Sequence, residues 1–322
     1  MSMTAEQAEW FSETFGRLVA NVEQVLLGKT LVIRLGFTSL ISGGHLLLED
    51  FPGTGKTSLA RAIAQTVQGT SSRVQFTPDL LPGDITGVSI YDQAHSAFEF
   101  HKGPIFSSIV LADEINRASP KTQSALLEVM EEGRVTVDGV SHEVGSPFMV
   151  IATQNPVEQA GTYTLPEAQL DRFLFKTSLG YPDHDTAVTL LLDSSNRARD
   201  AGITPIIASS SVVTMAQLAS EVFVDAAVLG YLNEIVTATR TDVSSTLGVS
   251  MRGALALARA AKTWALSQGR TFVSPDDIRD LAIPVLAHRI MVDPEADFAG
   301  VTAEDIVSRI LVEVAPPAFR AA

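Results

Sequence analysis

The sequence predicts an α/β fold in which a parallel sheet is covered by helices on both faces and is followed by an all-helical domain. Apolar runs of strand length alternate with helical patterns over residues 1–185, which is typical of a parallel sheet. Two runs, residues 109–112 and 148–152, are apolar throughout, as in strands buried on both faces. Beyond residue 185 the strand signals mostly stop, so residues 186–322 are expected to form a linker and a helical domain.

Two helices and a strand are expected at the start of the chain. Residues 4–27 place apolar side chains near helical spacing, and Gly28 follows as a stop signal. A second helix covers about residues 30–42, and the apolar run at residues 45–49 predicts the first strand. Helical spacing of apolar residues resumes at residues 59–67, so a helix is expected soon after this strand.

Residues 50–57, between this strand and the next helix, carry the most informative motif, Asp-Phe-Pro-Gly-Thr-Gly-Lys-Thr. A strand, a glycine-bearing loop and a helix cradle nucleotide phosphates, because backbone N–H groups and the positive end of the helix dipole converge on the anion. Lys56 can reach the β- and γ-phosphates, and the Thr57 hydroxyl can hold Mg²⁺. The predicted nucleotide-binding residues are Asp50, Pro52, Gly53, Thr54, Gly55, Lys56, Thr57 and Ser58.

The motif departs from the usual P-loop pattern at one position. Glycine is usual six residues before the lysine, where this chain has Asp50. Gly53 and Gly55 still allow the backbone conformations and the close approach that side chains forbid. Nucleotide binding therefore remains the expectation, against the alternative of a glycine-rich turn with an incidental lysine.

Two predicted hairpins interrupt the rest of the first domain. Short alternating apolar runs indicate one at about residues 84–103, and a second at residues 134–144 turns at an Asp-Gly pair. A helix is expected between them, with Ser119 as its N-cap and Gly133 as its stop. Both hairpins are therefore predicted as additions to the sheet.

The remaining predicted elements are two short strands and five helices. Residues 74–76 predict a short buried strand, and residues 174–177 predict the last strand of the sheet. In the second domain, serine or threonine N-caps mark the start of several helices. The five helices are expected at residues 214–222, 225–240, 250–268, 275–290 and 303–313.

Polar side chains at two strand ends indicate hydrolytic chemistry. Asp113 and Glu114 come directly after the apolar run at residues 109–112, and ligands of open parallel sheets bind at such carboxyl ends. Asp113 can hold the water shell of Mg²⁺, and Glu114 can orient the water that attacks the γ-phosphate and accept its proton. Asn155 follows the run at residues 148–152 and can sense the γ-phosphate while holding the attacking water.

Three arginines are candidates for phosphate contacts, each with a simpler alternative. Arg172 ends a short predicted helix at residues 166–172, where a cation complements the helix dipole; it could also be an arginine finger that reaches a neighbouring subunit's phosphates. Arg252, near the start of the helix at residues 250–268, is either a second phosphate sensor or an arginine in a surface ion pair. Arg117 is either a further arginine at a subunit interface or only a cap partner.

Composition narrows the class of protein. A chain of 322 residues with 46% hydrophobic and 19% charged residues suits a globular protein of two ordinary domains. The net charge is −14 and neither half is basic, so the broad footprint of a nucleic-acid binder is missing. Cysteine is absent, which excludes disulfides and thiolate chemistry. Without a secretory signal pattern or an apolar run long enough to span a bilayer, the expected location is the cytoplasm, with no membrane insertion.

Several of these motifs together resemble the MoxR family of AAA+ ATPases. The similarity runs over about residues 20–290. It is carried by residues 52–57, 111–118, 152–156, 165–173, 237–240, 248–252, 269–270 and 288–289. The resemblance implies an AAA+ αβα sandwich with a central parallel sheet, two hairpin inserts and an all-helical lid domain.

The resemblance also implies a role for each matching residue, with ATP and Mg²⁺ as cofactors. Met251 stands where many relatives have proline before the sensor arginine, which is the departure that bears on Arg252. By motif, Lys56 and Thr57 are Walker A residues, Asp113 and Glu114 are Walker B residues, Asn155 is sensor 1, Arg172 is the arginine finger and Arg252 is sensor 2.

A ring-forming, Mg²⁺-dependent ATPase is the leading functional expectation. The family resemblance implies a homo-oligomer, usually a hexameric ring, and partners with a von Willebrand A domain, which such chaperone-like proteins remodel or mature. The alternative is a nucleic-acid motor resembling the minichromosome maintenance helicases, which share the hairpin inserts. Those hairpins need basic tips, whereas residues 134–144 contain one arginine against two acidic residues and residues 84–103 contain one lysine. A nucleotide-gated binding module without turnover is a third possibility, against which Glu114 argues.

Overall fold

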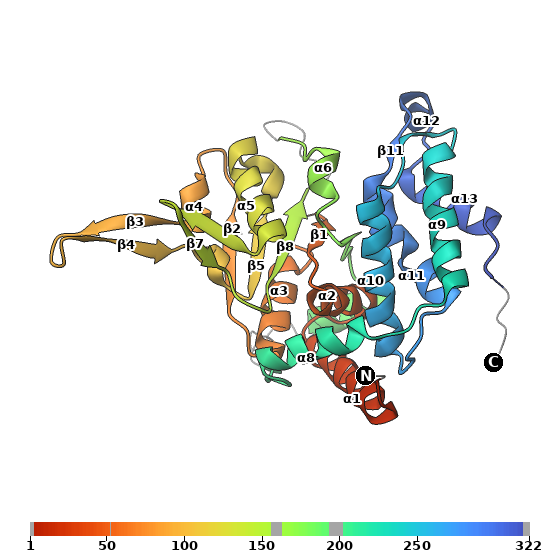
Figure 1. Cartoon of the computed structure of the whole chain (residues 1–322), viewed down its shortest axis with the longest axis horizontal. Helices are drawn as coiled ribbons and strands as arrows, with labels where there is room; N and C mark the ends of the chain where they lie inside the picture. Colours follow the sequence, from red (N-terminus) through yellow and green to blue (C-terminus); the bar gives the residue numbers. More distant parts are fainter. Residues whose placement is uncertain (1–2, 52, 156–162, 193–201, 318–322) are drawn as a thin grey trace. The chain divides into compact units, whose positions relative to one another are not determined.

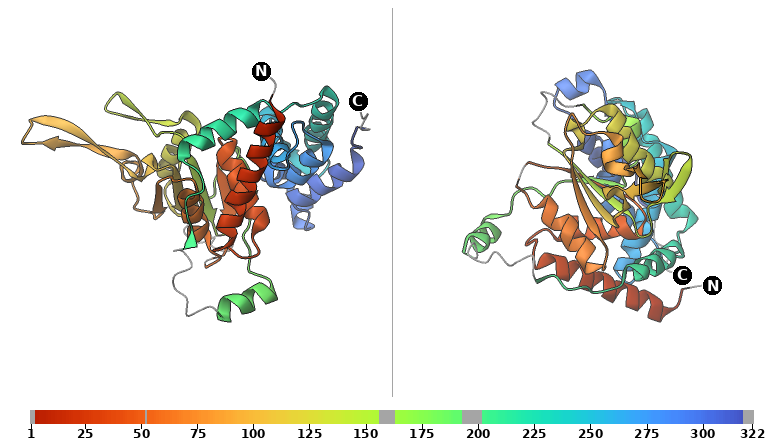
Figure 2. Two further views of the ribbon diagram at one scale, coloured as in Figure 1. Left: turned by 90° about the horizontal axis from the view of Figure 1, so that it is seen from below. Right: turned by 90° about the vertical axis from the view of Figure 1, so that its left-hand side faces the viewer.

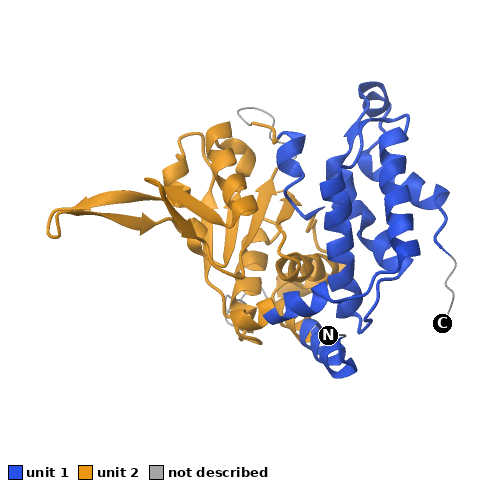
Figure 3. Ribbon diagram, in the orientation of Figure 1, with its two compact units in different colours: residues 1–16, 166–176, 214–322 blue, residues 17–165, 177–213 orange. Residues whose placement is uncertain are grey.

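The computed structural model describes residues 3–51, 53–155, 163–192 and 202–317. The chain groups by contact into two compact units, shown in Figure 3. Unit 1 comprises residues 1–16, 166–176 and 214–322, and unit 2 comprises residues 17–165 and 177–213. Each unit contains segments from both sides of residue 185, so this grouping does not test the domain boundary expected there, which stays a prediction.

The central sheet has five strands in the order β2-β5-β8-β1-β9, and its β2–β5, β5–β8 and β8–β1 pairs are parallel. This confirms the predicted parallel sheet. The strands are β1 (Leu46–Glu49), β2 (Ser71–Gln75), β5 (Ile109–Asp113), β8 (Met149–Gln154) and β9 (Phe175–Thr177).

Helices cover both faces of this sheet, as the handedness of its connections requires. The chain passes from β1 to β2 in one direction along the sheet and from β5 to β8 in the other. Because parallel crossovers are right-handed, α3 (Lys56–Thr66) and α5 (Pro120–Glu132) lie on opposite faces. Figures 1 and 2 show this αβα layering.

Burial separates the strands as their order in the sheet dictates. Every residue of β5 is buried, as is every residue of β8 except Gln154. The strand predicted at residues 74–76 is β2 at residues 71–75, an edge strand in which only Val74 is buried; Phe76, just after it, is buried as predicted, whereas Gln75 is exposed. An edge strand lacks a neighbour on one side, so it tolerates the polar side chains that its sequence carries.

Both predicted hairpins are present in unit 2. One joins β3 (Gly87–Asp92) to β4 (Ala97–Lys102) and projects from the sheet in Figure 1; the other joins β6 (Arg134–Val137) to β7 (Val140–Glu143). The turn residues Asp138 and Gly139 both have positive φ, as a two-residue hairpin turn requires. The rings of Phe100 and His142 stack with centroids 4.2 Å apart, so the two hairpins contact each other.

The remaining helices agree with the sequence patterns in kind and differ at their ends. The predicted caps Ser119, Ser250, Ser274 and Thr302 each accept a backbone N–H bond. The predicted helices are α1 (Ala5–Glu23), α2 (Thr30–Ile41), α8 (Ser209–Ser220), α9 (Ala226–Thr241), α10 (Met251–Ser267), α11 (Pro275–Leu286) and α13 (Ala303–Glu313).

Several short elements were not predicted from the sequence. Each is too short for periodicity to show, apart from α7, which has no buried residue to set an apolar stripe. They are α4 (Pro82–Thr86), α7 (His184–Leu192), α12 (Pro294–Phe298), β10 (Ser245–Leu247) and β11 (Met291–Val292). Within the described part of the chain, no helix has the length and apolar character needed to cross a membrane.

Candidate functional site

The loop between β1 and α3 is shaped by two glycines with positive φ. Gly53 has φ of 84° and Gly55 has φ of 98°, in a region that residues with a Cβ rarely adopt. Gly55 is the left-handed N-cap of α3, and Lys56, Thr57 and Ser58 form the first residues of this helix. The positive end of the helix dipole therefore lies at the loop, which is the arrangement that binds phosphate.

The Lys56 ammonium lies against carbonyls of its own loop. Its Nζ donates to the backbone oxygen of Asp50 at 3.2 Å and to that of Phe51 at 3.4 Å. The Thr54 hydroxyl donates to the same Phe51 carbonyl at 3.3 Å. Pro52, also predicted to contact nucleotide, lies outside the described residues. These contacts hold a cation within the loop, where it can meet an anion.

Asp50 anchors the base of the loop. Its side chain is 2% exposed, and one carboxylate oxygen accepts from Ser178 Oγ and Gly180 N, each at 2.9 Å. The other oxygen accepts from Leu179 N at 2.6 Å. The ring of Phe51 also stacks on that of Tyr181, with centroids 6.0 Å apart. The residue that replaces the usual glycine therefore ties the loop to the segment that follows β9.

Asp113, the last residue of β5, is held from two neighbouring strands. Its Oδ1 accepts from the hydroxyl of Thr153 on β8 at 2.6 Å, and its Oδ2 accepts from the guanidinium of Arg73 on β2 at 2.6 Å. Asp113 is 8% exposed and Thr153 is fully buried. The carboxylate is thus fixed at the carboxyl end of the sheet, next to a second strand end and an arginine.

Glu114 has a backbone conformation unusual for a residue with a side chain, with φ of 57° and ψ of 50°. Its N–H donates to the Thr153 hydroxyl at 2.8 Å, which secures this conformation. Its Oε2 accepts from Gln75 Nε2 at 2.7 Å and from Arg117 at 2.9 Å. Strained backbone of this kind persists only where the surroundings fix it, and it is common at active sites.

The strand register brings the P-loop, the two carboxylates and Asn155 together at the carboxyl end of the sheet. The N–H of Asp50 donates to the carbonyl of Gln154 at 3.1 Å, so Asn155 directly follows a residue bonded to the start of the loop. Asn155 is 9% exposed. The sequence reasoning missed Arg73, Gln75 and Thr153, which contact Asp113 or Glu114 from the flanking strands. Thr153 is polar near the end of the apolar strand β8, which is a sequence signal, whereas Arg73 and Gln75 belong to the largely polar strand β2 and carry none.

The other two predicted arginines belong to unit 1. The helix expected at residues 166–172 is one turn, α6 (Glu167–Leu170), and Arg172 lies partly buried in the turn that follows it. Arg252 is an exposed residue in the first turn of α10. Their approach to a nucleotide stays a prediction. Arg117 is half-exposed and forms an ion pair with Glu114, which leaves both readings of Arg117 open.

The donor set fits a Mg²⁺ ion shared with a nucleotide. Among the described residues, no three histidine, aspartate or glutamate side chains gather as a metal site of their own. Mg²⁺ at nucleotide sites needs only one or two protein oxygens beside phosphates and water, which Thr57 and Asp113 can supply.

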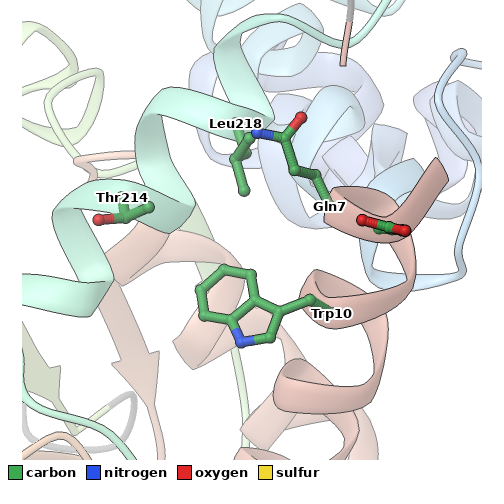
Figure 4. A pocket seen from close by; sticks show the side chains of 5 residues that line it. Gln7, Trp10, Thr214 and Leu218 are labelled. Atoms are coloured by element: carbon green, nitrogen blue, oxygen red, sulfur yellow. The ribbon is translucent and has the colours of Figure 1, made fainter. Parts of the chain in front are cut away.

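A separate open pocket in unit 1 contains none of the predicted site residues. It is formed between α1 and α8, and Figure 4 shows the indole of Trp10 facing Thr214 and Leu218. The other lining residues are Glu6 and Gln7, so its lining includes no lysine or arginine that could bind phosphate. Its chemistry does not suit a nucleotide.

Comparisons with known proteins identify the class to which this fold belongs. A family model described as the ATPase family associated with various cellular activities (AAA) matches residues 45–175, and a model of the AAA lid domain matches residues 237–310. The crystal structure of a proposed ATPase from Cytophaga hutchinsonii superposes with a TM-score of 0.91 at 37% identity, covering 97% of this chain and 98% of that one. Fold and site together define an AAA+ ATPase, an enzyme that hydrolyses ATP.

Relatives assign the chain within this class. Chaperone MoxR1 of Mycobacterium tuberculosis is 38% identical, with 96% of this chain and 84% of the relative aligned. Protein MoxR of Paracoccus denitrificans is 31% identical over 91% of this chain and 92% of its own length. The uncharacterized protein YeaC of Bacillus subtilis is 48% identical, with 95% and 96% covered. The chain belongs to the MoxR family of AAA+ ATPases.

Proposed function

We propose that the protein is a Mg²⁺-dependent ATPase that assembles into a ring and remodels partner proteins, with each ATP site completed by Arg172 of a neighbouring subunit. The observation that carries this proposal is that the P-loop, Asp113 and Glu114 lie together at the carboxyl end of the sheet. In a P-loop site, binding and positioning supply most of the catalysis of phosphoryl transfer. The residues for both are present in unit 2.

Each of these site residues has a distinct role in the proposed reaction. Lys56 neutralises charge on the β- and γ-phosphates, while Thr57 and Asp113 hold Mg²⁺, which when bound supplies further charge neutralisation. Glu114 orients the attacking water and accepts its proton, with its carboxylate held by Gln75 and Arg117. Asn155 holds the same water from the adjoining strand end.

The long hairpin favours protein partners over nucleic acid. Four large apolar side chains of β3 and β4 are 47–75% exposed: Val88, Ile90, Tyr91 and Phe98. Exposed apolar groups suit contacts with protein, whereas phosphate binding needs cations. At the tip, Asp92 accepts from His95, and Lys102 at the base lies over the ring of Phe106. These features, with the chaperone relative, support remodelling of a partner, for which a protein with a von Willebrand A domain is our candidate.

Mixing two inactive variants tests the shared site. Arg172→Ala should bind ATP and hydrolyse it poorly, because an arginine finger contributes on the order of 10³–10⁵-fold to turnover. Lys56→Ala should fail to bind ATP while keeping its own Arg172. We expect a mixture of the two to recover turnover, since a Lys56→Ala subunit supplies the finger to an Arg172→Ala neighbour. A mixture that stays inactive at every ratio would refute the trans assignment.

A further inference from the structure

The guanidinium of Arg289, in unit 1, donates hydrogen bonds to the main chain on both sides of Arg172. Arg289 lies in the 3₁₀ turn Ala287–Arg289 that follows α11, and its Nη2 donates to the carbonyl of Asp171 at 3.1 Å and to that of Phe173 at 2.6 Å. Its Nη1 donates to the Leu174 carbonyl at 3.4 Å. Only Arg172 separates the first two of these carbonyls. The path of the chain through Arg172 is therefore set by Arg289.

The same cluster reaches the first turn of α10, which carries Arg252. Arg289 Nε donates to Asp171 Oδ1 at 2.7 Å, and the hydroxyl of Ser250 donates to Asp171 Oδ2 at 3.1 Å. Ser250 is the N-cap of α10 and accepts the N–H of Gly253 at 3.2 Å. A Cβ at Gly253 would lie 2.7 Å from Arg289 Cδ, so the arginine stem packs directly on this turn.

The charged groups of this cluster are largely removed from solvent. The Arg289 side chain is 3% exposed and that of Asp171 is 19% exposed. Burial lowers the pKa of Arg289 from its ordinary value, and the adjacent Asp171 carboxylate opposes that shift. Burial, and then the charge of Arg289, hold the pKa of His288 well below its usual range, so its ring is neutral beside the guanidinium. A buried pair of this kind cannot open without leaving a charge uncompensated.

We propose that Arg289 and Asp171 are positioning residues that fix Arg172 to the first turn of α10, so that the finger and the sensor arginine of one subunit move as one body. The inference rests on the proposed trans role of Arg172. In the proposed function Arg172 acts on the nucleotide of the neighbour, and Arg252 is the candidate phosphate sensor. The cluster thus couples the two arginines, so that a phosphate bound by Arg252 alters the position of Arg172.

Arg289→Lys tests this inference while keeping the charge. Lysine offers three donors from one point, so it cannot span the carbonyls of Asp171, Phe173 and Leu174 as the planar guanidinium does. Because small misplacement of a catalytic group costs up to about 10²-fold, we expect kcat for ATP to fall about 10–100-fold, with KM changed less than about 3-fold. Arg309→Lys is the matched control, since Arg309 pairs with Asp242 elsewhere in unit 1. It should keep kcat within about 2-fold.

Complementation separates a positioning role from a structural one. Mixing Arg289→Lys with Lys56→Ala should restore turnover, because the Lys56→Ala subunit brings an intact finger. Asp171→Asn, which keeps the side-chain volume, should behave in the same way if Arg289→Lys fails to fold. Unchanged kcat in a folded Arg289→Lys or Asp171→Asn protein would overturn the inference.

The Arg172→Ala mixture distinguishes the two levels of the proposal. If that mixture recovers turnover and the Arg289→Lys and Asp171→Asn mixtures do not, the positioning inference is wrong and the shared site stands. If the Arg172→Ala mixture also stays inactive, the shared site fails and takes the inference with it.

Discussion

Asp50 stands where P-loops usually have glycine, and replacing it tests whether its buried carboxylate stabilises the protein. In Asp50→Asn, one of the two side-chain oxygens becomes an NH₂ group, which cannot accept a hydrogen bond. Either Leu179 N loses its acceptor, or Ser178 Oγ and Gly180 N lose theirs. A hydrogen bond to a charged group contributes about 1.5–3 kcal/mol, and the retained bonds weaken when the charge is lost. We expect a destabilisation of about 2–4 kcal/mol.

Thermal unfolding measures this effect. For a domain of this size, about 2–4 kcal/mol corresponds to a midpoint roughly 5–15 °C lower. Asp183→Asn is the matched control, because the Asp183 carboxylate also accepts two bonds, from Thr186, yet is fully solvated. Water can replace those partners, so the control should shift the midpoint by no more than about 2 °C.

A third variant separates the two explanations of Asp50 directly. Asp50→Gly restores the residue that P-loops usually have at this position, so motif reasoning predicts no loss of stability. The structure predicts a midpoint at least as low as that of Asp50→Asn, because glycine leaves all three donors without the carboxylate. A wild-type midpoint for either variant would refute the anchoring role of Asp50.

Two other substitutions test the hydrolysis site and the partner. Thr153→Val removes the hydroxyl that joins Asp113 to the N–H of Glu114. We therefore expect stability to fall by about 1–3 kcal/mol and ATP turnover to fall at least about 10-fold. Thr153→Ser keeps the hydroxyl and should stay near wild type, so an equal loss in both variants would contradict this role. Glu114→Gln should bind ATP without hydrolysing it and therefore retain partner proteins in affinity capture with ATP, whereas Lys56→Ala should not. Equal recovery by both variants would show that capture does not depend on the ATP state.

Local sequence patterns predicted much of the fold because they act over a few residues. The Ser119 and Gly133 signals bound α5 as expected, since capping involves only the adjacent turn. The continuous apolar run at residues 109–112 predicted a fully buried strand, and β5 is one. The site was predicted at the carboxyl ends of the strands because ligands of open parallel sheets bind there.

The contacts that hold the site come from long-range pairing, which no local pattern encodes. Thr153 reaches Asp113 across 40 residues because β5 and β8 are neighbours, and sequence spacing gives no sign of that register. Arg289 reaches Asp171 across 118 residues. The sequence marked residues 288–289 by family resemblance, but the task of Arg289 emerges only when its carbonyl partners are in place.

The interleaving of the two units has a consequence for recombination between relatives. Residues 166–176 are covalently part of the αβα half of the sequence, yet they group with the helical residues 214–322. A chimera that replaces only residues 214–322 by those of a relative would remove Arg289 and leave its partner Asp171 behind. We expect such a chimera to keep its function best when residues 166–176 are exchanged together with the helices.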